Sequence, residues 1–227
     1  MKHLNDYITE KLKINKETKS FVYYPKNKRE LKRILEERIE EDKNANLNDI
    51  DVSEVRDMSF LFKDLDIHNI DISEWDVSNV ENMQGMFKDC FSFNSDLSNW
   101  DVSKVTNMNA IFKECRIFTS DLSNWDVSNV DNMGFAFANC KKFNSDLSKW
   151  NVSKCTDIRN MFEKCEEFDS DLSNWDVSKA KYMQEMFCNC VKFNSDLSKW
   201  NVMKNVYSFY MFNNCKSLKN IPKWYNG

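Results

Sequence analysis

Six hydrogen-bond acceptor side chains recur every 25 residues and form the most regular set of chemical groups in this chain. They are Asp76, Asp101, Asp126, Asn151, Asp176 and Asn201. Each stands between a tryptophan and a valine, so an extended backbone turns it away from both apolar neighbours. Aligned carboxylates repel one another. They need compensation, either from nearby turn backbone and serine groups or from a basic partner or bound cations. We expect this column to be a partner-binding face.

A second column of aspartates recurs at the same interval, and a serine precedes five of its six members. The members are Asp71, Asp96, Asp121, Asp146, Asp171 and Asp196. Aspartate side chains accept hydrogen bonds from backbone two residues further on, so this column is predicted to complete turns. The D-x-D-x-D-G spacing typical of a calcium loop is absent. We expect neither a metal site nor a cofactor.

Cysteine is the third repeated group, at Cys90, Cys115, Cys140, Cys165, Cys190 and Cys215. Equivalent residues of stacked coils lie about 5 Å apart. That distance leaves two interpretations: buried thiols that pack as small apolar groups, which we favour, or disulfides between adjacent coils. Zinc-type C-x2-C pairs, a glycine-rich phosphate loop and a nucleophile elbow are all missing. His3 and His68 are the only histidines. We therefore predict that the protein is not an enzyme.

The repeat must position these groups. Large apolar residues share its period, at Trp75, Trp100, Trp125, Trp150, Trp175 and Trp200 and at seven phenylalanines from Phe62 to Phe212. A period of this length indicates coils that each pack on their neighbours. Trp100 and Val102 alternate as in a short strand, whereas Val105, Met108, Ile111, Phe112 and Cys115 have helical spacing. The sequence predicts an α/β repeat solenoid of about seven coils, each with a short parallel strand and a short helix.

The string L-x2-W-x-V-x2-V-x2-M-x2-I-F-x2-C, from Leu97 to Cys115, resembles the leucine-rich repeat pattern of the BspA-like class. The longer string FNSDLSNWDVSNVxNMxxMFxxC is similar to the 25-residue repeat of BspA-family surface proteins and mycoplasma-type lipoproteins. This resemblance extends over about residues 47–215. It implies a right-handed leucine-rich-repeat-like solenoid and a binding or adhesion module rather than an enzyme.

Three regions are predicted: an N-terminal cap or leader over 1–46, the solenoid over 47–221 and a C-terminal tail over 222–227. Within the first region, helical spacing occurs twice, at Leu4, Tyr7, Ile8 and Leu12 and again at Leu31, Ile34, Leu35 and Ile39. Residues 21–24, which precede Pro25, favour an extended piece. We expect a helical cap on the first coil, with a docking leader as the alternative.

Composition limits the partners. The net charge is −4, which gives no overall attraction to nucleic acid. The sequence shows no apolar run long enough to span a membrane and no secretory signal, so we expect no membrane insertion and favour a cytoplasmic or virion-associated location over secretion. The predicted function is non-catalytic: protein–protein interaction or adhesion-type binding of an unidentified protein through the outer faces of the repeats. The alternative is a structural or cargo protein of a bacteriophage or mobile element, docked through its N-terminal leader.

Overall fold

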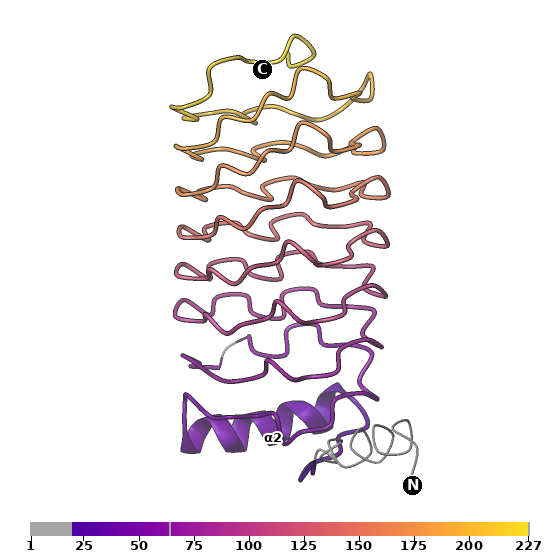
Figure 1. Ribbon diagram of the computed structural model, residues 1–227, viewed down its shortest axis with the longest axis vertical. Helices are drawn as coiled ribbons and strands as arrows, with labels where there is room; N and C mark the ends of the chain where they lie inside the picture. The colour runs from indigo at the N-terminus through magenta and orange to yellow at the C-terminus, as the bar shows by residue number, and fades with distance from the viewer. Residues whose placement is uncertain (1–19, 64, 227) are drawn as a thin grey trace, which may run out of the picture.

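The computed structural model describes residues 20–63 and 65–226, which wind into coils stacked along one axis with a helix across the N-terminal end (Figure 1). Isolated parallel bridges join equivalent positions of successive coils. The bridged residues are Asp57, Asn82, Asn107, Asn132, Asp157, Tyr182 and Tyr207. Each follows the previous one by 25 residues, so the predicted period is confirmed.

The prediction of one strand and one helix in each coil is wrong. In the part of the chain that the structure describes, α2 (Lys28–Glu41) is the one helix, and parallel pairing is confined to isolated bridges rather than extended strands. The coils consist of consecutive turns. The α/β solenoid, and with it the right-handed leucine-rich-repeat-like arrangement of one strand and one helix per coil, is therefore not the architecture of this protein.

Residues 108–115 show why apolar residues with helical spacing form turns here rather than a helix. The N–H of Ile111 donates to the carbonyl of Met108 at 3.2 Å, and the N–H of Cys115 donates to that of Phe112 at 2.9 Å. The third residue of each turn has positive φ, 55° at Ala110 and 70° at Glu114, as in a type II turn. Left-handed residues at these intervals cannot belong to a right-handed helix.

The other backbone N–H groups of this segment bond to the next coil. Met108 donates to Asn132, Ala110 to Gly134, Phe112 to Ala136 and Glu114 to Ala138, all at 2.8–2.9 Å. A helix would direct the same groups to carbonyls four residues earlier. Because stacking supplies an acceptor at every second residue, the segment forms a ladder of turns along the body.

The predicted strand at Trp100–Val102 also gives way to turns, since the N–H of Trp100 bonds to Leu97 and that of Val105 to Val102. Side chains make many of the contacts between coils here. The N–H of Leu97 donates to Ser120 Oγ at 2.9 Å, and its carbonyl accepts from Trp125 Nε1 at 3.0 Å. The same side-chain hydrogen bonds, which take the place of backbone–backbone bonds between coils, recur from coil to coil.

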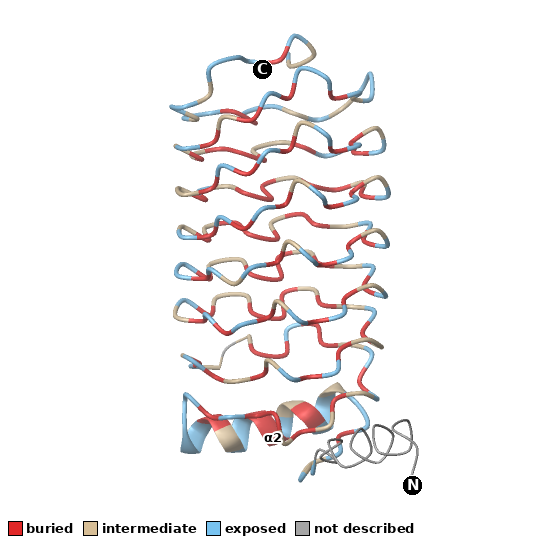
Figure 2. Cartoon of the chain, in the orientation of Figure 1, coloured by how far each residue is buried: buried red, intermediate tan, exposed pale blue. Residues whose placement is uncertain are grey.

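Columns of rings fill the body, and buried positions recur along every coil (Figure 2). The tryptophans that share the 25-residue period lie in the core, each 3–4% exposed from Trp75 to Trp200. Two phenylalanine columns run beside them. Phe112 and Phe118 of one coil are 4.2 Å apart, and Phe112 lies 5.6 Å from Phe137 of the next coil. The apolar core is therefore continuous along the stack.

Helix α2 begins after Asn27, whose side chain accepts from the Glu30 N–H, a standard N-cap arrangement. The helical spacing at Leu31, Ile34, Leu35 and Ile39 is confirmed, because all four lie on the buried face of α2. They belong to the same apolar core as the first coils, so the helix covers the N-terminal end of the stack. Residues 21–24 contribute one bridge, from Tyr23 to Ile50. The predicted first helix at Leu4–Leu12 lies outside the described residues, as does the proposed docking function of this leader.

The preferred interpretation of the cysteines is confirmed. All eight are thiols rather than disulfides, and all but Cys215 are buried. The repeated cysteines have a shared contact: each Sγ donates to the carbonyl of the phenylalanine 28 residues earlier, as from Cys140 to Phe112 at 3.0 Å. The column thus links adjacent coils by weak hydrogen bonds as well as by packing.

Candidate functional site

Five of the six predicted site residues are held in one way. The side-chain Oδ1 of Asp76, Asp101, Asp126, Asn151 and Asp176 accepts the backbone N–H of the serine two residues later, at 3.0–3.1 Å in every case. All five are exposed. Asn201 is exposed too, but Met203 replaces the serine there. The structure therefore presents an ordered row of side-chain oxygens along the outside of the body.

Local hydrogen bonds supply the compensation that these carboxylates need. The side chain and the backbone N–H of Ser103 hold the pKa of Asp101 below its ordinary value, and Ser178 does the same for Asp176. Lys104 and Lys179 add smaller attractions. Local bonding thus stabilises the charged form of Asp101 and Asp176. In the described residues, no group of three or more His, Cys, Asp or Glu side chains converges as a metal site would require.

The second aspartate column completes turns and joins coils. Asp121 Oδ1 accepts the Ser123 N–H and the hydroxyl of Ser145 in the next coil, both at 2.9 Å. That hydroxyl also accepts the Leu122 N–H at 2.9 Å. The arrangement recurs at Asp171 with Ser173 and Ser195. Ser145 and Ser195, which immediately precede Asp146 and Asp196, thus make the contact between coils that sequence reasoning missed, although their fixed spacing was visible.

These shifts predict a loss of stability in acid. The pKa is lowered in Asp96, Asp121, Asp146, Asp171 and Asp196, first by the N–H of the serine two residues later. A carboxyl with a lowered folded pKa binds a proton more readily when unfolded. Its stabilising effect is complete above the ordinary value of 3.8 and is lost as pH falls through the folded value. Urea titrations should give a steady unfolding free energy between about pH 5 and 7, which declines below about pH 4.

A control for this prediction replaces Asp96, Asp121 and Asp146 with asparagine. Asparagine keeps an oxygen for the serine N–H, as Asn151 demonstrates, but it does not titrate. The decline with acid should be shallower in this variant. An unchanged decline would show that other carboxylates control the acid response.

Burial lowers the reactivity of four of the thiols. Burial raises the pKa of Cys115, Cys140 and Cys165 well above the ordinary value, and it raises the pKa of Cys155 to about 12. Reactivity depends on the thiolate form. Cys115, Cys140 and Cys165 are therefore protonated side chains within the core.

Exposed aromatic residues gather at the C-terminal end. Phe209 and Tyr210 are 46% and 63% exposed. Tyr182 and Tyr207 were missed: their rings stack at 5.6 Å, and Arg159 lies 4.6 Å from the centre of the Tyr182 ring. The signal was available, because Asn or Asp occupies this coil position in every earlier coil from Asp57 to Asp157.

Comparisons with known proteins add one finding. A search of curated proteins and a search of solved structures each returned no match. Among the described residues, no helix is both long and apolar enough to cross a membrane. One family model matches the chain twice, over residues 30–147 and 118–225. This repeated match agrees with the mycoplasma-type repeat that the sequence resembles. The chain belongs to the family described as Mycoplasma protein of unknown function, DUF285.

Proposed function

We propose that this protein is a non-catalytic, protein-binding repeat module, and that its acceptor row contacts a basic surface of a partner protein. The row is formed by Asp76, Asp101, Asp126, Asn151, Asp176 and Asn201. The observation that carries the proposal is the repeated geometry. In five consecutive coils, the backbone N–H of the equivalent serine orients the side-chain oxygen. Groups oriented in advance lose little conformational freedom on binding.

Three further observations support a binding role. The aspartates of the row are exposed, so an ion pair to a partner replaces solvent contacts rather than buried bonds. Seven of the eight thiols are buried, and the described residues contain no group of three or more His, Cys, Asp or Glu side chains that could hold a metal. The likeness of the repeat to that of BspA-family surface proteins favours the same class of function, adhesion-type recognition, without the leucine-rich-repeat fold.

The test exploits the asparagine that already occurs in the row. Asn151 accepts the Ser153 N–H at 3.1 Å, so replacing Asp76, Asp101 and Asp126 with asparagine keeps each turn and removes three charges. The matched control replaces Asp96, Asp121 and Asp146 with asparagine, which changes net charge equally in the other column. Both variants should fold, and circular dichroism verifies this.

Affinity is then measured against the protein that wild type captures saturably from source cells. We expect the row variant to bind at least about tenfold more weakly, a loss of about 1.4 kcal/mol, and the control to bind within about twofold of wild type. The lost affinity should be greatest at low salt, because salt screens exposed charges. Equal binding by all three proteins would refute the site, and the absence of any saturable partner would refute the function.

A further inference from the structure

The coil at the C-terminal end departs from the repeat in a consistent direction. Met203 stands where earlier coils have serine, and Tyr207 and Phe209 stand where most earlier coils have polar residues. Their side chains are 39%, 56% and 46% exposed. Apolar groups that gather on a surface commonly mark a contact site. These substitutions therefore turn a polar edge into an apolar one at the end of the stack.

The altered residues enclose a groove of about 380 Å³. Its lining includes Met203, Lys204, Tyr207, Ser208, Phe209 and Trp224. Trp224 is held by its Nε1–H, which donates to the Leu197 carbonyl at 2.8 Å. Tyr207 is held by its stack on Tyr182 at 5.6 Å. Two rings with defined contacts thus belong to the lining.

The backbone in the groove has an open donor. In the preceding coil, Met183 donates its N–H to the Tyr207 carbonyl at 2.7 Å, and Glu185 donates to Phe209 at 3.1 Å. The equivalent of Met183 one coil later is Ser208, whose N–H donates to no other residue that the structure describes. The side chain of Tyr225 interacts with the neighbouring backbone groups of Tyr210 and Met211. The coil ladder therefore stops at the groove with a donor that an incoming carbonyl could use.

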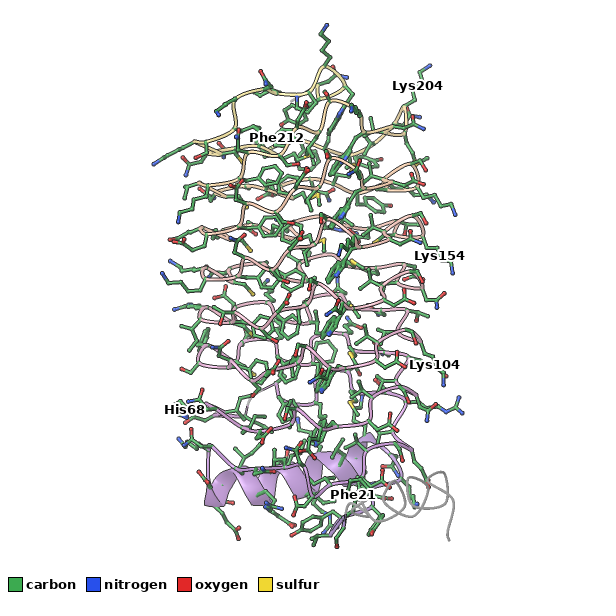
Figure 3. All side chains as sticks on the ribbon, viewed as in Figure 1. Phe21, His68, Lys104, Lys154, Lys204 and Phe212 are labelled. Atoms are coloured by element: carbon green, nitrogen blue, oxygen red, sulfur yellow. The ribbon has the colours of Figure 1, made fainter. Side chains whose placement is uncertain are left out.

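Charge distinguishes this end from the rest of the body. Residues 187–227 contain six lysines and one acidic residue, Asp196, so their net charge is +5. Residues 20–186 contain 21 Lys or Arg and 32 Asp or Glu, a net charge of −11. Of the six lysines, only Lys192 has an ion pair within the described chain. Lys204 lies at the groove and projects from the same edge of the stack as Lys104 and Lys154 (Figure 3).

We propose that this groove binds an extended, acidic segment of a partner protein. A backbone carbonyl of the segment accepts the Ser208 N–H and continues the coil ladder, as when an added strand joins a sheet edge. An apolar side chain of the segment packs among Met203, Phe209 and Trp224, and a carboxylate pairs with Lys204. The unused backbone donor favours a peptide over an anionic lipid surface.

The repeat supplies the variant that tests this site. Other coils carry serine at the position of Met203 and asparagine at the positions of Lys204, Tyr207 and Phe209. The quadruple variant Met203→Ser, Lys204→Asn, Tyr207→Asn and Phe209→Asn therefore uses residues that this fold already accommodates. A matched control changes Phe91→Val, Lys104→Asn and Ile117→Ser, which reduces one exposed apolar side chain and removes another, together with one lysine, in other coils.

The probe is a fluorescent peptide of about ten residues in which valine and glutamate alternate, because β-branched residues favour an extended backbone. We expect saturable binding to wild type, weakening of at least about tenfold in the quadruple variant, and a change within about twofold in the control. A peptide with lysine in place of glutamate should bind at least about tenfold more weakly than the acidic peptide.

Four outcomes would overturn the proposal. These are no binding of the acidic peptide, equal binding of the lysine peptide, equal losses in the two variants, and binding to phosphatidylserine vesicles with none to the peptide. Concentration-dependent self-association that the quadruple variant abolishes and the peptide does not compete would assign the groove to a second copy instead. The acceptor row is intact in all these proteins, so failure here leaves the proposed function standing.

Discussion

Replacement of Phe137 by alanine is expected to lower the free energy of unfolding by about 3–5 kcal/mol. Phe137 is 1% exposed, and its ring lies 4.2 Å from Phe143 in its own coil. It also lies 5.6 Å from Phe112 and 5.7 Å from Phe162 in the coils on either side. Alanine leaves a cavity lined by three flat rings that the coil ladder holds in place. The surroundings have little freedom to close it, so the cost should be at the upper end for this kind of change.

The control for Phe137 is Phe91→Ala. Phe91 is 49% exposed and packs against the guanidinium of Arg116 at 4.6 Å. Removal of an exposed ring should cost no more than about 1 kcal/mol. Urea denaturation at fixed salt, followed by tryptophan fluorescence, measures both variants. Similar costs at the two positions would contradict a rigid core of stacked rings.

Replacement of Trp125 by phenylalanine is expected to cost about 2–4 kcal/mol. The indole is 3% exposed, and its Nε1–H donates to the Leu97 carbonyl of the preceding coil at 3.0 Å. Loss of a buried donor accounts for about 1–3 kcal/mol. The smaller ring leaves part of the indole volume empty, which adds a cavity cost. The effect is large because this bond takes the place of a backbone ladder bond between coils.

Trp224→Phe provides the comparison. Trp224 makes the same bond, from Nε1 to Leu197 at 2.8 Å, but at the partly buried C-terminal end. Water can replace the lost donor there, so the cost should stay below about 1.5 kcal/mol. Both variants are measured by urea denaturation with far-ultraviolet circular dichroism, since each change removes a fluorophore. Equal costs would show that the ring volume, rather than the buried indole bond between coils, controls stability.

Prediction from sequence succeeded where the information is local. The column of Asp121 was predicted to complete turns, and local turn bonding was one of the two explanations offered for the column of Asp101. Asp101 and Asp121 both accept the N–H of the serine two residues later. An aspartate–serine pair at that spacing forms the same turn in many surroundings. The helical spacing at Leu31, Ile34, Leu35 and Ile39 was recognised for a similar reason, because these four apolar residues lie within one segment; the structure extends the helix over Lys28–Glu41.

Prediction failed where two local structures give one apolar pattern. Met108, Ile111, Phe112 and Cys115 face inward both in a short helix and in turns closed by bonds between residues three apart. The decisive feature is the acceptor for the N–H groups of Met108, Ala110, Phe112 and Glu114, which is the next coil. No property of one coil shows that partner, since it lies 24 residues further along the chain.

The C-terminal groove was beyond prediction for the same reason. Met203, Tyr207 and Phe209 are ordinary deviations when read along the chain, and Trp224 lies in a different segment. Only the stacked coils bring them around one space of about 380 Å³ beside the Ser208 N–H.

The sequence by itself determined the 25-residue period, the inward columns of Trp, Phe and Cys, and the local turns at the aspartates. An apolar position that recurs in every coil is buried in every coil. The aspartate turns are local because each side chain bonds to backbone two residues further along the chain. Tertiary structure alone decided that the coils contain turns in place of strands and helices, and that the groove exists. Backbone N–H groups bond to the acceptor that lies within reach, and stacking, rather than the order of residues within one coil, places that acceptor.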